Sequence, residues 1–494
     1  MSIFNNNILA GAASQSTTTP VHTIDQSIRF NSADDGNMYR VVGSGGNTKT
    51  WTFSGWFKLG LLGSQRGASP FLWSGYQDDS NRLQLMLDNA VGTGAAGDFL
   101  CLYSSTSGSI FQTTRVFRDP SAWYHIVVVS DTSNAVSSER IRLYINGIRE
   151  TSFSTINYPS LNADLAWNKD GSTWYLGKYY SGSGSGTYNY DGYMAELVNL
   201  DGTATDCNSF GEFNSNGIWV PKDVSGLSFG TKGWYIDGRD SSDLGDDESG
   251  NGNDFTTSGL AAHDQVADSP TNNFAVTNAV NSHPNVALSE CNLKQVNSGT
   301  SIAYGSSSTI LLTSGKWYVE WRLNTLVSNE YPVVGLYSTN EGRSSLSTAS
   351  SFPGLLGTFA DIGFGANDGN RFEDNTTTSS WGNAYANGNI AALAIDMDNK
   401  KIWFGHNNSG SFVWQASGDP AAGSNEANTK AFASDVVVGV GHYSSSSVTF
   451  NYGQDGTFGG TETAQGNADG NGVGNFYYAP PTGFLAICTK NLGS

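Results

Sequence analysis

Charged residues are scarce in this sequence, and basic residues are the scarcer kind. Asp, Glu, Lys and Arg make up 14% of the 494 residues, whereas globular proteins usually contain about 25%. With 25 basic residues against 44 acidic residues, the formal net charge is -19. A phosphate backbone is repelled by such a chain unless a local basic stripe exists, and the sequence has none. Nucleic acid is therefore not an expected partner.

Long apolar runs are also missing. No stretch of the sequence approaches the roughly 18 consecutive apolar residues of a membrane-spanning helix. The N-terminus lacks the basic start and apolar core of a secretory signal. We therefore expect neither membrane insertion nor secretion. A virion component that is released by lysis meets both conditions.

Cysteine forms no recognisable metal or redox motif. Cys101, Cys207, Cys291 and Cys488 lie far apart, with no Cys-x-x-Cys pair and no His at metal-binding spacing. We expect four small buried side chains with free thiols.

Glycine and aromatic residues are abundant, and short alternating segments recur between turn residues. In residues 140–145 apolar side chains alternate with Arg and Tyr, and Asn146-Gly147 supplies the two positive-φ residues of a type I′ turn. Residues 123–131 form a nearly continuous apolar run, which is typical of a central strand. The sequence therefore predicts an all-β protein built from antiparallel β-sandwiches with jelly-roll-like topology.

Five short motifs follow one another in the first half of the chain. They are Phe-Ser-Gly-Trp-Phe at 53–57, Trp-Tyr-His-Ile-Val-Val-Val at 123–129, Leu-Tyr-Ile-Asn-Gly at 143–147, Tyr-Leu-Gly at 175–177 and Asp-Gly-Tyr-Met-Ala-Glu-Leu at 191–197. Their order resembles the laminin G-like, concanavalin A-like jelly-roll family over residues 24–201. The resemblance implies two curved antiparallel sheets, often used to bind carbohydrate or protein and sometimes holding calcium at a rim.

The second half carries three further motifs. They are Gly-Lys-Trp-Tyr-Val-Glu at 315–320, Asp-Met-Asp-Asn-Lys-Lys-Ile-Trp-Phe at 396–404 and Phe-Asn-Tyr-Gly-Gln at 450–454. This order resembles a SPRY (B30.2-type) domain, which implies a second β-sandwich with loops that grip protein partners and no family catalytic residues. We expect this domain, closed by a C-terminal strand, to occupy residues 286–494.

Two segments fall outside these resemblances. Residues 1–23 hold too little apolar material for a core, so we expect a tail that attaches the protein to a particle. Residues 202–285 are predicted to form an acidic, loop-rich connector. Within it, Asp246, Asp247 and Asp254 belong to a Gly-punctuated loop that suits Ca²⁺, with a solvated acidic loop as the alternative.

The sequence gives little indication of catalysis. The concanavalin A-like hydrolases place carboxylates on alternate residues of one strand, but Glu196 and Glu320 have no carboxylate two residues away. We expect such carboxylates to be satisfied by backbone donors or by an Arg such as Arg322. No nucleophile elbow, in which a serine sits on a sharp strand-to-helix turn, is indicated, and His125 lies within an apolar strand, where packing is the simplest role. The protein is therefore not expected to be an enzyme.

Aromatic residues give the stronger functional signal. Tyrosine offers a flat apolar ring and a hydroxyl group at low entropic cost, and among Ser, Gly and Asn it forms adaptable binding surfaces. One group frames a Gly/Ser loop and a second accompanies Asp78 and Asp79, although sandwich cores also use many aromatic residues. The predicted ligand-binding residues are Tyr179, Tyr180, Tyr188, Tyr190, Trp73 and Tyr76.

The layout of residues 247–255, 268–274 and 475–492 resembles bacteriophage virion proteins, especially fibre or appendage proteins. We therefore hypothesise a non-enzymatic protein on the virion surface that binds a host-surface glycan or protein and contacts other virion structural proteins. Because fibre proteins are often trimers, we expect a homo-oligomer. Two alternatives stay open: a structural protein that decorates a capsid or tail, and a polysaccharide depolymerase.

Overall fold

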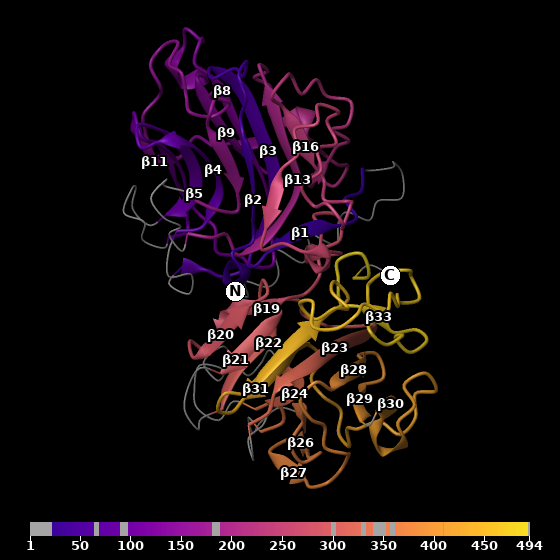
Figure 1. The fold of residues 1–494 in the computed structure, drawn as a ribbon. Coiled ribbons are helices and arrows are strands. Elements are labelled where there is room, and N and C mark those ends of the chain that lie inside the picture. The colour runs from indigo at the N-terminus through magenta and orange to yellow at the C-terminus, as the bar shows by residue number, and fades with distance from the viewer. Residues whose placement is uncertain are drawn as a thin grey trace. The chain divides into compact units, whose positions relative to one another are not determined.

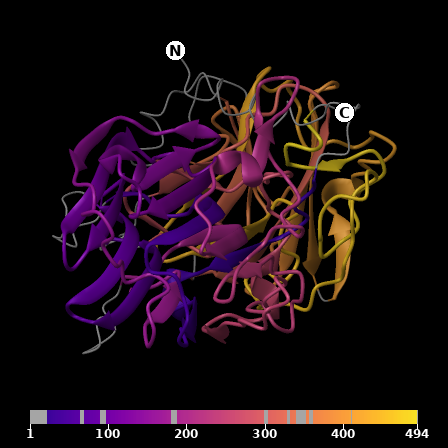
Figure 2. The ribbon, with the colours of Figure 1, turned by 90° about the horizontal axis from the view of Figure 1, so that it is seen from above.

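The computed structural model describes most of the chain, and strands dominate it (Figure 1). The only helical elements in the described part are short 3-10 turns, so the predicted all-β class is confirmed. The chain divides between Asn272 and Asn273 into two compact units, which Figure 2 distinguishes by colour. The predicted tail lies outside the described residues up to position 21. The described residues are 22–63, 69–88, 97–179, 188–297, 303–327, 332–338, 352–355, 361–408 and 410–492.

The first unit contains two eight-stranded sheets, which we call sheet A and sheet B. A separate two-stranded sheet joins β14 (Gly211–Phe213) and β15 (Trp219–Pro221). Sheet A has the order β10 (Ile148–Arg149), β9 (Ile141–Ile145), β8 (Trp123–Asp131), β3 (Thr50–Leu59), β13 (Gly192–Asp201), β1 (Ser27–Phe30) and β18 (Gln265–Val266), with β16 (Trp234–Ile236) also paired to β13. Sheet B has the order β11 (Phe153–Ile156), β7 (Gly108–Val116), β6 (Phe99–Ser104), β5 (Asn81–Asp88), β4 (Phe71–Asp78), β12 (Thr173–Leu176), β2 (Asn37–Val41) and β17 (Thr256–Ser258).

The two local predictions for sheet A are confirmed. Strand β8 lies between β3 and β9, as expected for a central strand. The β9–β10 hairpin turns at Asn146 and Gly147, whose φ angles are 48° and 79°. Glycine is needed at position 147 because an added Cβ would lie 2.1 Å from the Trp219 ring. The hairpin and strand β15 are therefore packed directly against each other.

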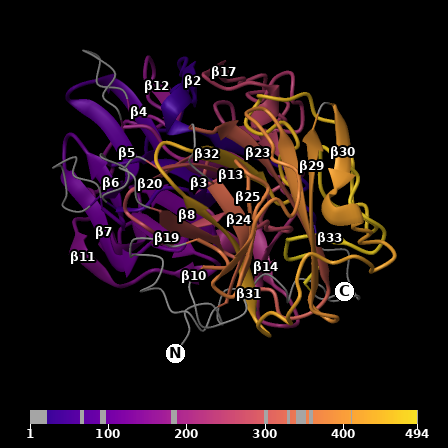
Figure 3. The ribbon, with the colours of Figure 1, turned by 90° about the horizontal axis from the view of Figure 1, so that it is seen from below.

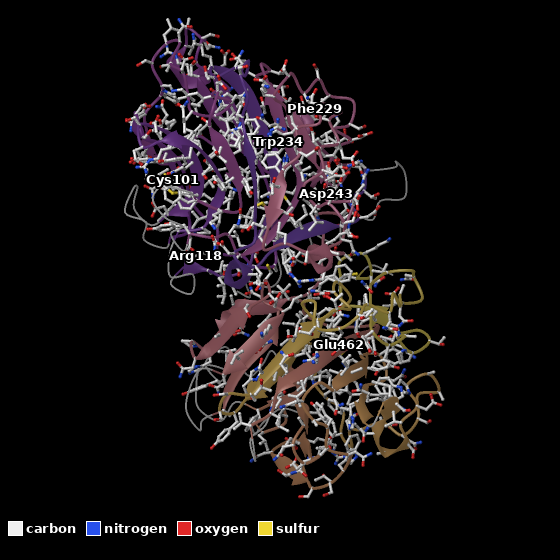
Figure 4. All side chains as sticks on the ribbon, in the orientation of Figure 1. Cys101, Arg118, Phe229, Trp234, Asp243 and Glu462 are labelled. Atoms are coloured by element: carbon white, nitrogen blue, oxygen red, sulfur yellow. The ribbon has the colours of Figure 1, made fainter. Side chains whose placement is uncertain are left out.

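Aromatic rings from both sheets fill the core of the first unit. Trp51 of sheet A lies edge-on to Trp73 of sheet B, with ring centroids 6.4 Å apart. Trp167 packs against both rings, at 6.1 Å and 4.2 Å. Trp174 and Trp234, which is labelled in Figure 4, continue this cluster with centroids 6.0 Å apart. Because rings from both sheets interleave, the two sheets form a β-sandwich.

The predicted connector, residues 202–285, is divided differently in the structure. Strands β16, β17 and β18 within it pair with β13, β2 and β1, and thus complete sheets A and B of the first unit. The second unit then begins at Asn273, before β19. Strands of two or three residues carry too little alternation to be recognised in a sequence, which explains why this stretch suggested a connector.

The second unit has two antiparallel sheets of its own. Strand β33 (Leu485–Ala486) pairs in parallel with β23, as a short closing strand near the C-terminus. One sheet has the order β19 (Thr277–Ser282), β22 (Tyr304–Ser308), β31 (Val436–His442), β24 (Pro332–Ser338), β25 (Ile362–Gly365), β26 (Arg371–Glu373) and β27 (Thr376–Thr378). The other has the order β20 (Val286–Ser289), β21 (Lys294–Asn297), β32 (Ser447–Asn451), β23 (Lys316–Thr325), β28 (Ile390–Asp396), β29 (Lys401–Asn408) and β30 (Ser411–Trp414).

The second core also joins side chains from both of its sheets. Phe364 of β25 stacks on Phe404 of β29 in the opposite sheet, with centroids 5.4 Å apart, and Trp321 of β23 packs on Phe450 of β32 in its own sheet at 6.4 Å. The motif at 396–404 spans the turn between β28 and β29, which pair as an antiparallel hairpin. Each unit is thus a sandwich with its own core.

All four cysteines are buried, as expected, and Cys101 and Cys207 are free thiols. Burial raises the pKa of the Cys101 thiol to about 12 and that of Cys207 to about 11. Both thiols are therefore protonated at neutral pH. Among the described residues, no helix is long and apolar enough to span a bilayer.

Candidate binding face

The outward face of sheet B carries a set of tyrosines. Trp174 and Leu176 of β12 are fully buried in the core, so Tyr175 between them points outward. Tyr175 lies opposite Tyr39 on β2, and their rings stack with centroids 5.9 Å apart. On the other side it lies opposite Ser74 on β4. Figure 3 shows how β2, β12, β4, β5 and β6 follow one another in this sheet.

The same face continues across strands β4, β5 and β6. Tyr76 of β4 lies opposite Arg82 of β5, and Tyr103 of β6 lies opposite Gln84 of β5. The Arg82 guanidinium lies 5.6 Å from the centre of the Tyr103 ring. Strand pairing thus brings together side chains that are far apart in the sequence.

Two predicted residues, Tyr179 and Tyr188, pack onto this face from the segment after β12. Tyr179 stacks on Phe71 of β4 with centroids 4.9 Å apart, and Tyr188 meets Tyr179 edge-on at 5.6 Å. Met86 and Cys101 lie beneath them in the same cluster. We call the resulting half-exposed surface the tyrosine face; its members are Tyr39, Tyr76, Tyr103, Tyr175, Tyr179, Tyr188 and Arg82.

Asp35 holds both ends of the segment that carries Tyr179 and Tyr188. Its two carboxylate oxygens accept hydrogen bonds from Lys178 Nζ at 2.7 Å and 2.6 Å. One of them also accepts a hydrogen bond from Asn189 Nδ2 at 2.8 Å. A single carboxylate therefore fixes the residues next to both tyrosines.

Arg82 and Gln84 provide the polar groups of the tyrosine face. Arg82 Nη1 donates a hydrogen bond to the Tyr179 hydroxyl at 2.8 Å. Gln84 is 4% exposed, and its Nε2 has no hydrogen-bond partner among the described residues. A buried donor without a partner costs about 1–3 kcal/mol of stability. Native proteins retain few such groups, and binding sites are one place where they persist.

Two of the predicted ligand-binding residues are not on this surface. Trp73 and Tyr190 are both 0% exposed, so the expectation that they contact a ligand is corrected. A bulge between Phe71 and Trp73 turns Trp73 toward the core while Phe71 faces outward. The Tyr190 hydroxyl donates a hydrogen bond to the Lys58 carbonyl oxygen at 2.8 Å inside the sandwich. Tyr180 lies outside the described residues.

The acidic loop is organised by hydrogen bonds of Asp247. Its Oδ1 accepts from the backbone N–H groups of Tyr235 and Ser249, each at 2.9 Å. Its Oδ2 accepts from the Ser249 hydroxyl and the Asn253 N–H, each at 2.8 Å. Asp254 Oδ1 accepts from the Asp247 N–H at 3.2 Å. In the described part of the chain no three acidic, His or Cys side chains are grouped to hold a metal, and calcium at Asp246, Asp247 and Asp254 stays a prediction.

Glu320 is satisfied by donors in the second unit, chiefly from the backbone. It accepts hydrogen bonds from the N–H groups of Tyr477 at 2.9 Å and Tyr478 at 2.7 Å, and from the Tyr318 hydroxyl at 3.0 Å. Burial raises its pKa to about 7, although these donors oppose the rise. Arg322 pairs with Glu462 and not with Glu320. Because Glu320 binds the backbone of Tyr477 and Tyr478, it fixes the chain near the C-terminus.

Glu196 is similarly engaged in the first unit. Its φ of 49° places it in the left-handed region, at a bulge where the pairing of β13 with β3 shifts. Its carboxylate accepts a hydrogen bond from the Tyr235 hydroxyl at 2.8 Å and lies 3.5 Å from His22 Nε2. The hydrogen bond to Glu196 raises the pKa of His22, partly offset by burial.

His125 and Ser54 form a buried pair, which sequence reasoning missed because Ser54 lies on another strand. His125 Nε2 is 2.8 Å from Ser54 Oγ, and Trp219 Nε1 donates a hydrogen bond to His125 Nδ1 at 3.0 Å. Burial lowers the pKa of His125 to about 3, so the ring is neutral. Because Nδ1 accepts a hydrogen bond, Nε2 carries the proton of the neutral ring. Nε2 therefore donates a hydrogen bond to the Ser54 hydroxyl oxygen. The histidine therefore does not act as a base toward Ser54 in this arrangement.

Comparisons with known proteins agree with the fold of the first unit. Residues 31–206 match the model of the Concanavalin A-like lectin/glucanases superfamily. The two packed antiparallel sheets of the first unit agree with this match, so the first unit is similar to a laminin G, concanavalin A-like jelly-roll domain. No curated protein sequence matches the chain.

Solved structures with similar folds have low sequence identity. Domains LG4-5 of the mouse laminin alpha1 chain are 8% identical, with 88% of this chain and 92% of that chain covered and a TM-score of 0.29. The SPRY domain of human HERC1 is 18% identical, with 32% and 87% covered and a TM-score of 0.21. The CBM40 of the Ruminococcus gnavus IT-sialidase, bound to alpha2,3 sialyllactose, is 13% identical, with 36% and 88% covered and a TM-score of 0.22.

Proposed function

We propose that this protein is a non-enzymatic glycan-binding protein and that the tyrosine face is its binding surface. The observation that carries the proposal is the gathering of six half-exposed tyrosines and Arg82 on the outward side of sheet B. The lectin-like fold of the first unit suggests carbohydrate or protein binding, which agrees with this role.

The chemistry of the face favours a glycan over a protein partner. A sugar ring has an apolar face bordered by hydroxyl groups, and a tyrosine ring likewise combines an apolar face with one hydroxyl. The stacked pair Tyr39 and Tyr175 and the edge-on pair Tyr179 and Tyr188 provide such surfaces at two places. Fixed aromatic side chains lose little conformational entropy when they bind.

A non-enzymatic role is supported by the state of the candidate reactive groups. The carboxylates of Glu196 and Glu320 accept hydrogen bonds from neighbouring protein groups, and neither belongs to the tyrosine face. The His125 and Ser54 pair is buried, with its proton on the histidine nitrogen that faces the serine. A depolymerase would release new reducing ends from a bound polysaccharide, which we do not expect.

The second part of the proposal concerns location. The likeness of the whole chain to bacteriophage fibre and appendage proteins supports a place on the virion surface, as a homo-oligomer that contacts other virion proteins and binds a host-surface glycan. If mass spectrometry did not detect this chain in purified particles, the virion assignment would be contradicted. A purely structural, decorating protein would be found in particles but would bind no glycan.

A glycan array tests the binding surface. The variant Tyr76→Ala/Tyr179→Ala removes two exposed rings, and because base or sugar stacking on one aromatic ring contributes about 1–3 kcal/mol, affinity should fall at least tenfold. Tyr158→Ala is the matched control, because Tyr158 is 38% exposed outside the tyrosine face. Both variants should remain folded, with a lower unfolding temperature for the double variant only, because Tyr179 also packs on Phe71. Equal glycan affinity in the parent and the double variant would refute the tyrosine face as the binding surface.

A further inference from the structure

Arg82 lacks the carboxylate partner that several other buried or half-buried basic side chains of the first unit have. Acidic residues outnumber basic residues by 44 to 25 in this chain. Lys58 pairs with Asp268, and Lys178 pairs with Asp35, at 2.5 Å and 2.6 Å. Arg82 forms no ion pair with any residue of the described part of the chain; its polar contacts there are with tyrosines. Arg140 likewise forms no ion pair there, but its guanidinium donates to three backbone carbonyl oxygens, whereas the side chain of Arg82 contacts tyrosines.

The rest of the first unit cannot supply that counter-charge readily. Its undescribed segments, residues 13–21, 64–68, 89–96 and 180–187, contain no Asp or Glu. The nearest acidic turn is engaged internally, because Asp78 accepts hydrogen bonds from Asn81 Nδ2 at 2.9 Å and 3.0 Å, and Asp79 accepts one from the Tyr76 hydroxyl at 3.5 Å. The charge of Arg82 is therefore left for a group outside the unit.

From these contacts we infer that the tyrosine face recognises an acidic polysaccharide, and that Arg82 binds a carboxylate of the sugar chain. This inference rests on the proposed glycan-binding function. A guanidinium has five N–H donors in a planar fork that matches a carboxylate, and the hydrogen bond to Tyr179 uses one of them. The rings of Tyr103 and Tyr179 hold that fork in place beside the surfaces on which sugar rings stack.

The net charge of -19 is compatible with such a ligand. At physiological ionic strength, charges more than about 8 Å apart are largely screened, so the groups near Arg82 decide the local interaction. A polysaccharide with one carboxylate per sugar unit also carries less charge than duplex DNA, which has one negative charge per roughly 1.7 Å. An acidic peptide fits less well, because peptides that bind sheets usually pair with the backbone of an edge strand, and this face presents side chains.

Affinity measurements on matched polymers test the inference. Polygalacturonate, alginate and hyaluronate are each compared with their carboxyl-reduced forms, using the full-length protein and calorimetry. The parent protein should bind at least one acidic polymer about tenfold more tightly than its reduced form, since charge-assisted hydrogen bonds are roughly twice as strong as neutral ones. Arg82→Gln should lose this preference and bind both forms alike.

Control variants separate charge from folding. Arg149→Gln removes the same charge from a residue on sheet A and should keep the preference of the parent. Arg82→Lys keeps the charge without the fork and should retain only part of it. Equal affinity of the parent protein for acidic and reduced polymers would overturn the inference while leaving the glycan-binding function intact. Absence of binding to all six polymers, together with a negative glycan array, would overturn both.

Discussion

Replacing Asp268 with Asn tests whether the first unit extends to Asn272. The Asp268 carboxylate lies 2.5 Å from Lys58 Nζ, and it also accepts a hydrogen bond from Trp123 Nε1 at 3.0 Å. Both charged side chains are 0% exposed. Asn keeps an oxygen for Trp123 but removes the charge that compensates Lys58. Breaking a buried pair in this way typically costs about 3–5 kcal/mol.

Such a loss is a large part of the total stability of a domain, which is about 5–15 kcal/mol. We would measure it on the full chain by urea unfolding, with hydrogen exchange of the amides in β1, β3 and β18 reporting on the first unit. The matched control is Glu139→Gln, which breaks a pair with Arg149 whose side chains are 34% and 38% exposed. That change should cost less than about 1 kcal/mol.

The double variant Lys58→Met/Asp268→Leu separates charge from packing. Replacing both partners of a buried pair by apolar residues is often neutral, so this variant should recover most of the stability lost in Asp268→Asn. A loss below about 1 kcal/mol in Asp268→Asn itself would refute the reasoning. It would mean that residues 265–272 are not docked on the first unit as the structure has them.

Three further changes have defined outcomes. Gly147→Ala should destabilise the first unit by about 3 kcal/mol in urea unfolding, because Ala disfavours a φ of 79° and its Cβ would clash with Trp219. Gly108→Ala is the control: its φ is 69° but its Cβ would meet open space, so it should cost only about 1–2 kcal/mol in the same assay. Gln84→Met should stabilise the protein by about 1 kcal/mol in urea unfolding while weakening glycan binding, because it removes a buried donor without a partner. Burial raises the pKa of Glu320 to about 7 from a usual value of 4.5. The folded state therefore favours the protonated carboxyl, and the second unit should lose up to about 3 kcal/mol of stability as pH rises from 4.5 to 7. The unfolding temperature of Glu320→Gln should depend less on pH over this range.

Local patterns predicted the parts of the fold that depend on neighbouring residues. The Asn146-Gly147 turn and the apolar run at 123–131 were sufficient to place a hairpin and a central strand. The assignment of residues 202–272 to the first unit depends on pairing between distant strands of two or three residues, such as β16 with β13. Sequence alternation does not reveal such pairing, because it reports which face a residue occupies but not which strand lies beside it.

The candidate site was predictable only in part for a similar reason. Tyr179 and Tyr188, beside a Gly/Ser loop, and Tyr76, near Asp78 and Asp79, were predicted from neighbouring residues in the sequence, and they do lie on the tyrosine face. Tyr39 and Tyr175 join it through the strand register, which links positions 136 residues apart in the sequence. Trp73 was misplaced because it lies three residues before Tyr76 in β4, so the alternation of a strand puts the two side chains on opposite faces of the sheet.

The buried, protonated thiols of Cys101 and Cys207 allow conformational opening of the first unit to be measured chemically. Since each sulfur is shielded in the native state, alkylation by a maleimide can proceed only when the surrounding segment opens, and the rate therefore measures that opening. Cys101, labelled in Figure 4, packs in the same cluster as Tyr179 and Tyr188. A sugar that occupies this surface should slow its modification, while Cys207, whose thiol lies 3.4 Å from the Gly147 carbonyl oxygen, continues to react at its original rate.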